Sequence, residues 1–347
     1  MDKVFKYELF NKMIRDFAVN EVKPLAHEVD EQERFPYETV EKMAKLGLMG
    51  IIVPKEYGGM GGDYKMYIKA VEELSKVCAT TGVILSAHTS LCIAPIMEYG
   101  NEEQKKKYLP KLASGEWLGA FGLTEPNAGT DANNQTTTAV KEGDHWVLNG
   151  SKIFITNAGP ANVYFVIAVT GRNPKGVECA AFIVEKGFPG FSVGKKELKM
   201  GIRGSSTCEL IFENCIVPEA NLVGKIGEGV KMALKTLDGG RVGISAQALG
   251  IAEGALEATV AYVKERKQFN KPISAFQNTQ FCLADLYTKI NAASLLVERA
   301  TEAKQNKSPM LGMYAAQAKL FAAETAMEVT TKCVQLHGGY GYTREYP

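Results

Sequence analysis

One segment at the end of the first third of the chain combines hydroxyl, amide and glycine residues in a way that suits ligand binding. Residues 120–131, AFGLTEPNAGTD, read as a short strand that runs into a turn rich in Pro, Asn, Gly and Thr. Hydroxyl groups and backbone amides in such a turn can form hydrogen bonds with a polar heteroaromatic ring or a phosphate. Composition alone favours an ordinary strand-end turn, so the ligand-binding interpretation depends on what else the chain contains.

A second segment, Leu237-Asp238-Gly239-Gly240-Arg241, has two glycines where a helix should be forming. Each glycine costs a helix about 1 kcal/mol relative to alanine, so the pair needs a reason. A backbone without side chains can be approached closely by a ligand, and Asp238 and Arg241 could orient that ligand. The alternative is a helix start that carries a surface ion pair.

A third segment, QLHGGYGY at residues 335–342, combines a histidine with a cluster of glycines. His337 alone is more typical of a helix end than of a ligand, and the glycines are typical of a helix C-cap. The sequence contains no His-Glu-x-x-His pair, no Gly-x-Ser-x-Gly motif and no Walker A motif. Zinc, serine-hydrolase and P-loop chemistry are therefore not indicated, and we expect no metal site.

The elements that must position these segments change character along the chain. The first third has helical periodicity, and Asn101 followed by Gln104 predicts an N-cap with a polar N3 partner. In the middle third, residues 146–155 read as a hairpin, because Asn149-Gly150 between apolar runs is typical of a type I′ turn. Strand-like runs then follow one another without helices between them, which favours an antiparallel sheet over a Rossmann-type array.

From about residue 229 the pattern is helical again. Four apolar residues recur every seven positions: Met313, Leu320, Met327 and Val334. Ala316 and Ala323 lie between them, and small residues at this spacing let helices approach closely, as in a bundle or a subunit interface. We therefore predict an α+β protein of three domains. These are an N-terminal helical domain at residues 1–116, a middle antiparallel β-domain at 117–226 and a C-terminal helical bundle at 227–347, expected to be incomplete.

Composition limits the classes of function that remain. The 347 residues include 40 basic and 39 acidic side chains, and a net charge of +1 does not favour binding to nucleic acid or an anionic membrane. The longest apolar runs, such as residues 163–169, are shorter than the about 18 residues of a membrane span. No signal peptide is expected at the N-terminus. The seven cysteines form no Cys-x-x-Cys pair, which indicates reduced packing residues in a cytoplasmic protein.

Taken together, the motifs resemble those of the flavin-dependent acyl-CoA dehydrogenases. Residues 121–131 resemble that family's flavin signature, and residues 154–157, FITN, resemble its second flavin contact. Residues 266–269, Gln277 and residues 335–339 then follow in the order of the family's remaining cofactor motifs. The resemblance therefore covers the whole chain.

Two further stretches, residues 81–95 and 237–241, are most similar to the bacterial short-chain, butyryl-CoA members of this family. The resemblance implies oxidation of a saturated short-chain acyl-CoA to the trans-2-enoyl-CoA, with FAD as cofactor and an electron-transfer flavoprotein as electron acceptor. It also implies a homo-oligomer, with a dimer of dimers as the expected form. An acyl-CoA oxidase and a catalytically silent acyl-CoA- or flavoprotein-binding subunit are the alternatives.

The resemblance also assigns roles to individual residues. Some would contact the flavin ring, others would hold the diphosphate and adenine side of FAD, and three would contact the CoA thioester. The implied cofactor-binding residues are Phe121, Leu123, Thr124, Thr130, Phe154, Ile155, Thr156, Arg266, Phe269, Phe276, Gln277, Gln335, Leu336, Gly338 and Gly339. The implied substrate-binding residues are Thr130, Asp238 and Arg241.

The sequence departs from the family pattern at two places. Phe154 stands where many members have Trp, which keeps an apolar wall but loses the indole donor. The family's usual base is a glutamate in a Tyr-Glu-Gly-Thr-like motif after the last glycine cluster, and this sequence ends at Pro347 before such a motif. Some relatives carry the base at the position of Gly240, which has no side chain. We therefore expect no catalytic base among these residues.

Overall fold

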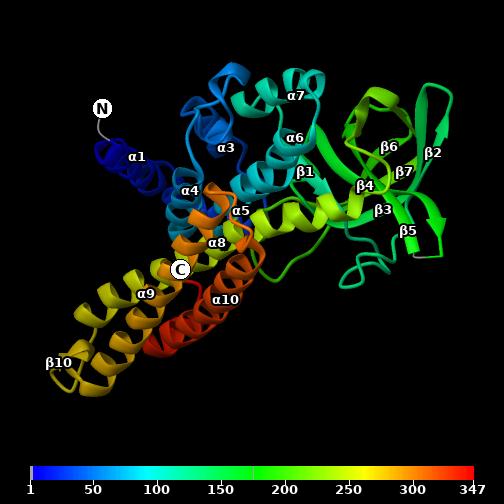
Figure 1. The fold of residues 1–347 in the computed structure, drawn as a ribbon. Helices are drawn as coiled ribbons and strands as arrows, with labels where there is room; N and C mark the ends of the chain where they lie inside the picture. Colours follow the sequence, from blue (N-terminus) through cyan, green and yellow to red (C-terminus); the bar gives the residue numbers. More distant parts are fainter. Residues whose placement is uncertain (1–2, 175) are drawn as a thin grey trace. The chain divides into compact units, whose positions relative to one another are not determined.

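Figure 1 shows the computed structural model, which describes residues 3–174 and 176–347. The chain forms two compact units, each assembled from separate parts of the sequence. Unit 1 contains the first 28 residues, Tyr64–Val83 and Arg241–Pro347, and unit 2 contains Val29–Asp63 and Ile84–Gly240. The order of helices, strands and helices along the chain confirms the predicted α+β class. The predicted domain limits after residues 116 and 226 stay predictions.

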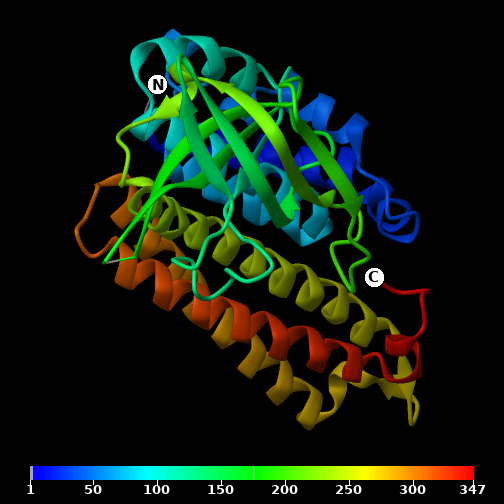
Figure 2. The same ribbon diagram turned by 90° about the vertical axis from the view of Figure 1, so that its right-hand side faces the viewer.

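Unit 1 is built from helices and one short hairpin. The long helices α9 (Gln277–Gln305) and α10 (Leu311–Leu336) lie side by side in Figures 1 and 2. An ion pair links them, with 2.6 Å between Lys289 Nζ and Glu328 Oε1. The other elements that contribute to unit 1 are α1 (Lys3–Phe17), η1 (Ala18–Val22), α2 (Lys23–Glu31), α4 (Tyr64–Val77), α8 (Gly229–Glu265), β9 (Lys267–Gln268), β10 (Lys271–Pro272), η6 (Ile273–Ala275) and η7 (Gly338–Tyr342).

Two glycines of α8 allow it to pack closely against α4. A Cβ atom at Gly250 would lie 2.3 Å from the carbonyl oxygen of Glu72, and one at Gly254 would lie 2.1 Å from that of Lys76. Lys76 also forms an ion pair across this contact, with 2.7 Å between its Nζ and Oε2 of Glu253. The spacing of small residues on α8 thus sets the distance between the two helices.

The predicted seven-residue repeat lies on α10, and its side chains are exposed. The exposed fractions are 46% for Met313, 60% for Leu320, 69% for Met327 and 50% for Val334. The buried residues of α10 are mostly small, such as Ala315, Ala318 and Ala322. The repeat therefore does not form the core of unit 1, and a subunit interface at this position stays a prediction.

Unit 2 contains a twisted sheet, best seen in Figure 2, together with short helices. Its strands are β1 (Gly119–Gly122), β2 (Thr138–Glu142), β3 (His145–Thr156), β4 (Val163–Asn173), β5 (Gly176–Glu185), β6 (Phe191–Lys196), β7 (Thr207–Pro218) and β8 (Leu222–Val223). They pair in the order β6-β7-β3-β2-β4-β5-β8, and β1 pairs with β4 off this path. Most pairings are antiparallel, as predicted, but β1 and β2 each run parallel to β4.

Short helices precede and follow the strands of unit 2. The predicted N-cap is confirmed, because the Asn101 side chain accepts a hydrogen bond from the Gln104 amide at 2.8 Å, and Gln104 Oε1 accepts one from the Asn101 amide at 3.1 Å. These elements are α3 (Tyr37–Lys45), η2 (Leu48–Gly50), η3 (Lys55–Tyr57), α5 (Ala79–Ala87), which begins in unit 1, η4 (His88–Ile93), α6 (Ala94–Tyr99), α7 (Glu102–Ser114) and η5 (Glu219–Asn221).

The hairpin predicted at Asn149-Gly150 is wrong. Residues 145–156 form one strand, β3, which pairs with β2 on one side and with β7 on the other. Gly150 has φ +136° and lies at an irregularity in the β7 register, where an added Cβ would lie 2.7 Å from Thr137 Cα. The glycine therefore permits close strand packing, and the chain reverses earlier, at Gly143 with φ +60°.

The expectation that no stretch reaches the length of a membrane span needs a correction. Residues Ala79–Tyr99 form a continuous helical stretch with a window of mean hydropathy 1.4, long and apolar enough to cross a membrane. In this structure 78% of that window is buried inside the protein, as expected for a core helix. The seven cysteines are all free thiols, and five of them are buried.

Candidate functional site

The predicted site residues fall into two groups, one in each unit. Unit 2 contains Phe121, Leu123, Thr124, Thr130, Phe154, Ile155, Thr156 and Asp238. Unit 1 contains Arg241, Arg266, Phe269, Phe276, Gln277, Gln335, Leu336, Gly338 and Gly339. Each group is described in turn.

The first group begins where β1 ends. Phe121 is buried, and its ring lies nearly parallel to that of Phe165 on the neighbouring strand, with 6.2 Å between centroids. Leu123 is buried and Thr124 is half-buried. Thr130 is exposed in the loop of residues 126–134, which extends beyond the sheet in Figure 2. The strand thus ends in a buried anchor followed by residues that approach the surface.

A bulge in β3 exposes Phe154. The β7 register shifts between Lys152 and Ile155, and within this bulge Phe154 has φ +59° and is 61% exposed. Ile155 is buried and Thr156 is half-buried. A left-handed backbone is uncommon for a bulky residue, and such strain is concentrated at functional sites.

The structure brings these two segments together. The backbone amide of Ile153 donates a hydrogen bond to the carbonyl oxygen of Thr124 at 2.8 Å. We call residues 123–124 and 153–156 the ring platform. It presents an exposed aromatic ring and two half-buried threonines, which is the mixture of apolar surface and hydrogen-bonding groups that a flavin ring needs.

A buried polar cluster beneath the platform escaped the sequence analysis. Lys152 is fully buried, and its Nζ donates hydrogen bonds to Glu125 Oε1 at 2.6 Å, to Gln135 Oε1 at 2.9 Å and to the Leu123 carbonyl at 3.2 Å. We call Lys152, Glu125 and Gln135 the buried node. Its one sequence signal is a lysine directly before the apolar residues 153–155.

Electrostatic interactions keep both Glu125 and Lys152 of the buried node ionised. Burial alone would raise the pKa of Glu125, but the Lys152 ammonium and hydrogen bonds from Thr136 hold it at about 2. Burial lowers the pKa of Lys152 to about 8, although the Glu125 carboxylate opposes this. Both groups are therefore charged at neutral pH, and the Glu125 carboxylate, which also accepts from Thr137, is fully engaged.

Asn157, which follows the ring platform, has an unused hydrogen-bond acceptor. Its backbone is left-handed at φ +66°, and its Nδ2 donates to the carbonyls of Ile84 at 3.1 Å and Gly119 at 3.4 Å. Its Oδ1 is buried and has no hydrogen-bond partner among the described residues. A ligand or a water molecule next to the ring platform would satisfy it.

In unit 1, the second group begins at a strained hairpin between β9 and β10. Its two turn residues, Phe269 and Asn270, have φ +51° and +60°, the left-handed pair that a type I′ turn requires. Phe269 is 87% exposed, and its ring lies 6.1 Å from that of Phe276. Gln277 is the exposed first residue of α9. Phe269 thus resembles Phe154 in being an exposed aromatic residue on a strained backbone.

The end of α10 lies next to this region. The His337 ring stacks on that of Tyr262, with 4.3 Å between centroids, and the Tyr262 hydroxyl donates to the His337 carbonyl at 3.2 Å. The Arg266 guanidinium lies 5.9 Å from the ring of Tyr340. The structure therefore brings Arg266 and the end of α10 together. His337 is the C-cap of α10, which confirms that it is a helix-end residue.

The remaining predicted residues of the second group differ in exposure. Gln335 is exposed and Leu336 is half-buried. Gly338, with φ +60°, and Gly339 are both exposed, and a Cβ added to either would meet nothing within 4 Å. This end of α10 is thus open enough for a ligand to approach its backbone.

The glycine pair beside Asp238 and Arg241 does not begin a helix. Both residues are half-buried and lie inside α8, which starts at Gly229. A Cβ at Gly240 would lie 2.9 Å from the end of the Leu91 side chain. The alternative of a helix start is therefore wrong. The group that approaches Gly240 closely is the Leu91 side chain, and a ligand contact at this segment stays a prediction.

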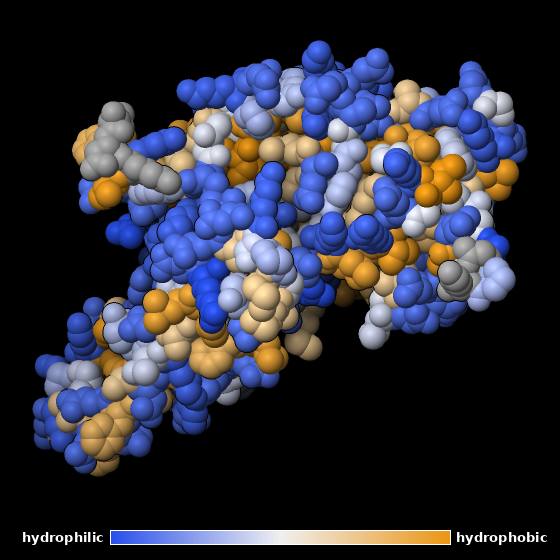
Figure 3. All heavy atoms as spheres, in the orientation of Figure 1, coloured by the Kyte–Doolittle hydropathy of each residue, from blue (hydrophilic) through white to orange (hydrophobic). Residues whose placement is uncertain are grey.

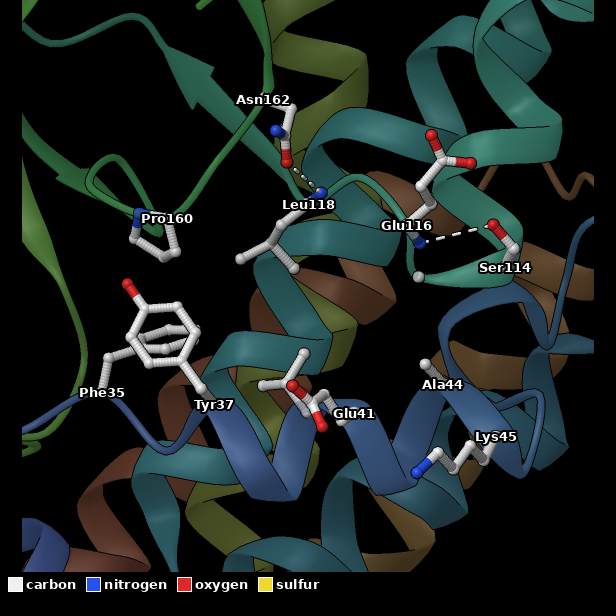
Figure 4. A pocket seen from close by; sticks show the side chains of 12 residues that line it. Phe35, Tyr37, Glu41, Ala44, Lys45, Ser114, Glu116, Leu118, Pro160 and Asn162 are labelled. Atoms are coloured by element: carbon white, nitrogen blue, oxygen red, sulfur yellow. Dashed lines mark hydrogen bonds between the residues drawn. The ribbon is translucent and has the colours of Figure 1, made fainter.

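A cavity of about 530 Å³ lies elsewhere in unit 2 (Figure 4). Phe35, Tyr37, Leu118 and Pro160 line it, and none of the predicted site residues does. Its rim carries charged side chains of both signs, including Glu41. This cavity is thus separate from the ring platform.

Three domain models match successive parts of the chain. The acyl-CoA dehydrogenase N-terminal domain matches residues 6–116, the middle domain matches residues 120–215 and the C-terminal domain matches residues 227–347.

Individual proteins show the same likeness. The short-chain specific acyl-CoA dehydrogenase of Clostridium acetobutylicum is 60% identical over 340 residues, which are 98% of this chain and 89% of the relative. A chain solved in work on the electron transferring flavoprotein of Acidaminococcus fermentans has a TM-score of 0.95 and 54% identity, and the match covers 98% of this chain and 89% of that chain. Butyryl-CoA dehydrogenase of Megasphaera elsdenii has a TM-score of 0.95 and 49% identity, with 98% and 90% covered.

One structure of lower identity includes the cofactor. An acyl-CoA dehydrogenase from Bacillus anthracis, solved in complex with FAD, has a TM-score of 0.89 and 37% identity. That match covers 98% of this chain and 61% of the other.

Proposed function

Because the chain belongs to the acyl-CoA dehydrogenase family, we propose that it oxidises a short-chain, butyryl-CoA-like thioester to the trans-2-enoyl-CoA. FAD is its cofactor, and an electron-transfer flavoprotein takes the electrons. The identity to a short-chain specific relative supports the substrate class. The structural observation that carries the proposal is the ring platform, where the Ile153–Thr124 hydrogen bond joins two segments with flavin-binding character.

FAD, when bound, supplies the hydride acceptor that no side chain can provide. The chain's own residues bind and orient. Thr124 and Thr156 offer hydroxyl groups to the polar edge of the ring, while the exposed Phe154 forms an apolar wall that excludes water. Thr130, Asp238 and Arg241 bind the CoA moiety. The residues that hold the diphosphate and adenine side are Arg266, Phe269, Phe276, Gln277, Gln335, Leu336, Gly338 and Gly339.

Removal of the substrate α-proton needs a base, and neither Gly240 nor Glu125 is suited to this role. Gly240 has no side chain, and the Glu125 carboxylate is buried against Lys152 with a pKa near 2. The family resemblance puts the base on a glutamate that would follow the final glycine cluster. Polarisation of the thioester carbonyl would have to accompany proton removal, since the α-proton is only weakly acidic in water.

The chain also has features of a subunit in a homo-oligomer, and we propose a dimer of dimers in the cytoplasm. The exposed side of α10 carries Leu320 and Met327, and α9 exposes Tyr287 and Leu295 by 59% and 67%. Figure 3 shows hydrophobic residues, in orange, among hydrophilic ones on the face of the protein that it draws. Exposed apolar patches of this kind mark protein interfaces.

The test first identifies the bound cofactor and then measures reduction and reoxidation of the flavin. The purified protein should be yellow and should release FAD, rather than FMN, on heat denaturation, because the unit 1 residues match contacts beyond the flavin ring. Butyryl-CoA should bleach the bound flavin under anaerobic conditions, although slowly in the 347-residue chain, and ferricenium should reoxidise it. Rapid reoxidation by oxygen would instead indicate an acyl-CoA oxidase, and butyryl-CoA binding without any bleaching would indicate a silent subunit.

A further inference from the structure

Lys152 is the only fully buried lysine among the described residues, and all three of its ammonium hydrogens are used. Its acceptors are the carboxylate of Glu125, the amide oxygen of Gln135 and the backbone carbonyl of Leu123. An ammonium group can donate three hydrogen bonds and no more. The group therefore has a complete set of partners at a fixed position in the protein interior.

The partners of Lys152 are themselves held in place. Glu125 is 2% exposed, and its Oε2 accepts from the amide of Thr136 at 2.7 Å and from the Thr136 hydroxyl at 2.8 Å. Gln135 donates through Nε2 to the Ala132 carbonyl at 3.1 Å. The buried node thus fixes both ends of the loop of residues 126–134, because Glu125 directly precedes this loop and Gln135 directly follows it.

The same lysine ties the two halves of the ring platform. Lys152 precedes Phe154 by two residues on β3. Its Nζ donates a hydrogen bond to the carbonyl oxygen of Leu123, which belongs to the other segment of the ring platform. The next residue, Ile153, holds the carbonyl of Thr124. Lys152 and Ile153 of β3 therefore bind the carbonyl oxygens of Leu123 and Thr124, which follow β1. These two hydrogen bonds keep residues 123–124 and 153–156 from moving independently.

A buried ion pair is a weak reason for stability, since apolar residues of similar volume often stabilise a protein as well or better. The presence of a lysine at residue 152 is better explained by its ability to position the Leu123 carbonyl. An apolar side chain at residue 152 could fill the space, but it could not hold the Leu123 carbonyl.

We propose that Lys152 is a positioning residue for flavin binding, which presets the ring platform before the cofactor arrives. This inference rests on the proposed function, because it assumes that the platform receives the flavin ring. Lys152 touches neither cofactor nor substrate in this role. It acts through the Leu123 carbonyl and through Glu125, and it keeps the platform from having to order itself on binding.

The experiment compares two variants of the 347-residue chain with a control. Lys152→Met removes the ammonium but leaves an unpaired buried carboxylate, whereas Lys152→Met with Glu125→Gln removes both charges. Lys141→Met is the matched control, since Lys141 also lies in this sheet and pairs with Glu219, but is exposed. The measurements are the dissociation constant for FAD, from flavin fluorescence, the visible spectrum of bound flavin and the urea midpoint of the FAD-free chain.

Both Lys152 variants should bind FAD about 10- to 100-fold more weakly, the loss expected for a hydrogen bond from a charged donor. Their bound flavin should show a shifted visible spectrum. The double variant should regain much of the urea midpoint that the single variant loses, because its buried charges are gone. Lys141→Met should leave FAD affinity unchanged. FAD affinity that returns to the wild-type value in the double variant would overturn the proposal, since the node would then matter only through its charge balance.

A second measurement needs no variant. Hydrogen exchange of the FAD-free wild-type chain should show residues 153–156 already protected, in contrast to the loop of residues 126–134. If residues 153–156 exchanged as fast as the loop, the proposal would be overturned, because this part of the ring platform would not be ordered before FAD binds. A wild-type chain that binds no FAD at all would instead contradict the proposed function, so the two failures are distinguishable.

Discussion

A guanidinium group near bound CoA should strengthen thioester binding without taking part in the chemistry, which makes Arg241 a test of the proposed substrate site. Arg241→Ala should weaken butyryl-CoA binding by about 1–3 kcal/mol, as expected for hydrogen bonds to a charged group. A residue with only a surface ion pair would cost about 0–1 kcal/mol. Titration of the bound-flavin spectrum with butyryl-CoA measures the dissociation constant.

The matched control for this titration is Arg299→Ala, at an exposed arginine of unit 1 whose guanidinium lies 4.0 Å from the ring of Tyr314. That variant should bind butyryl-CoA as the wild type does. An Arg241→Ala chain with an unchanged dissociation constant would remove Arg241 from the substrate site.

Glu125 should contribute to stability in a pH-dependent way. Its pKa is lowered from 4.5 to about 2, so its contribution is complete above pH 4.5 and is lost as the pH falls towards 2. The shift corresponds to about 3 kcal/mol. Urea unfolding of the wild type between pH 5 and pH 2 should show this loss.

Glu125→Gln should be less stable at pH 7, by about 3–5 kcal/mol, because it leaves the Lys152 ammonium buried without a counter-charge. It should also lose less stability than the wild type over the acidic range. Glu219→Gln, at an exposed ion pair with Lys141, should change neither the stability at pH 7 by more than about 1 kcal/mol nor the acid profile. Parallel acid profiles for Glu125→Gln and the wild type would refute the assignment.

Residue types alone indicate the polar turn after β1, but they do not indicate the buried node that lies next to this turn. The hydroxyls and glycines of residues 120–131 were visible in the sequence, whereas the partner of Glu125 is 27 residues away on another strand. A lysine between a serine and an isoleucine is compatible with a surface strand until the burial of that strand is known. The buried node therefore needed the sheet pairing, which sequence spacing does not provide.

At the scale of elements, the contact between α4 and α8 predicts that a usually favourable substitution is harmful. Gly254→Ala gains about 1 kcal/mol of helix propensity. The new Cβ would lie 2.1 Å from the Lys76 carbonyl oxygen, and a backbone clash of this kind costs more than the gain. We expect a net loss of about 2 kcal/mol by urea unfolding.

Gly240→Ala provides the comparison for this experiment. There the added Cβ would meet the end of the Leu91 side chain at 2.9 Å, and a flexible side chain can rotate away. This variant should lose clearly less stability than Gly254→Ala. Equal losses, or a more stable Gly254→Ala chain, would show that the two helices separate easily.

Local signals predicted some elements correctly and misled for others. The Asn101 capping box holds because it depends only on residues three apart. Asn149-Gly150 was read as a turn from equally local information, but β3 continues through it because β2 and β7 pair on both sides. The parallel pairing of β1 with β4 joins residues 44 apart, such as Gly119 and Val163, which no local pattern specifies.

For the whole molecule, the prediction concerns the catalytic base. The 347-residue chain should reduce its flavin slowly with butyryl-CoA, since neither Gly240 nor Glu125 can remove the α-proton. A chain extended by a segment with the Tyr-Glu-Gly-Thr-like motif should be faster by about 100- to 10,000-fold, the usual contribution of a general base. Anaerobic stopped-flow bleaching at saturating butyryl-CoA gives the rates.

These rates must be expressed per bound flavin, because a longer chain could also retain more FAD. The control is the extended chain with the motif glutamate replaced by glutamine, which should bleach as slowly as the 347-residue chain. Rates within a few-fold of each other for the extended and unextended chains would show that another residue is the base.

The order of the elements was the most predictable property of the whole molecule. Changes of hydrophobic period near residues 117 and 229 were enough to indicate helices, then strands, then helices. How unit 1 is assembled was not predictable, because it joins Tyr64–Val83 to residues beyond Arg241. Contacts such as that of Lys76 with Glu253 depend on the fold and not on neighbouring residues.

The buried node also restricts how the sequence can evolve. Losing the charge of Lys152 or of Glu125 first leaves the other buried and unpaired, at a cost of about 3–5 kcal/mol. Since a typical protein is stable by only about 5–15 kcal/mol, such an intermediate would be strongly disfavoured by selection. The two codons are therefore expected to persist together or to be replaced together, and a lineage that has drifted widely on its surface should still carry both.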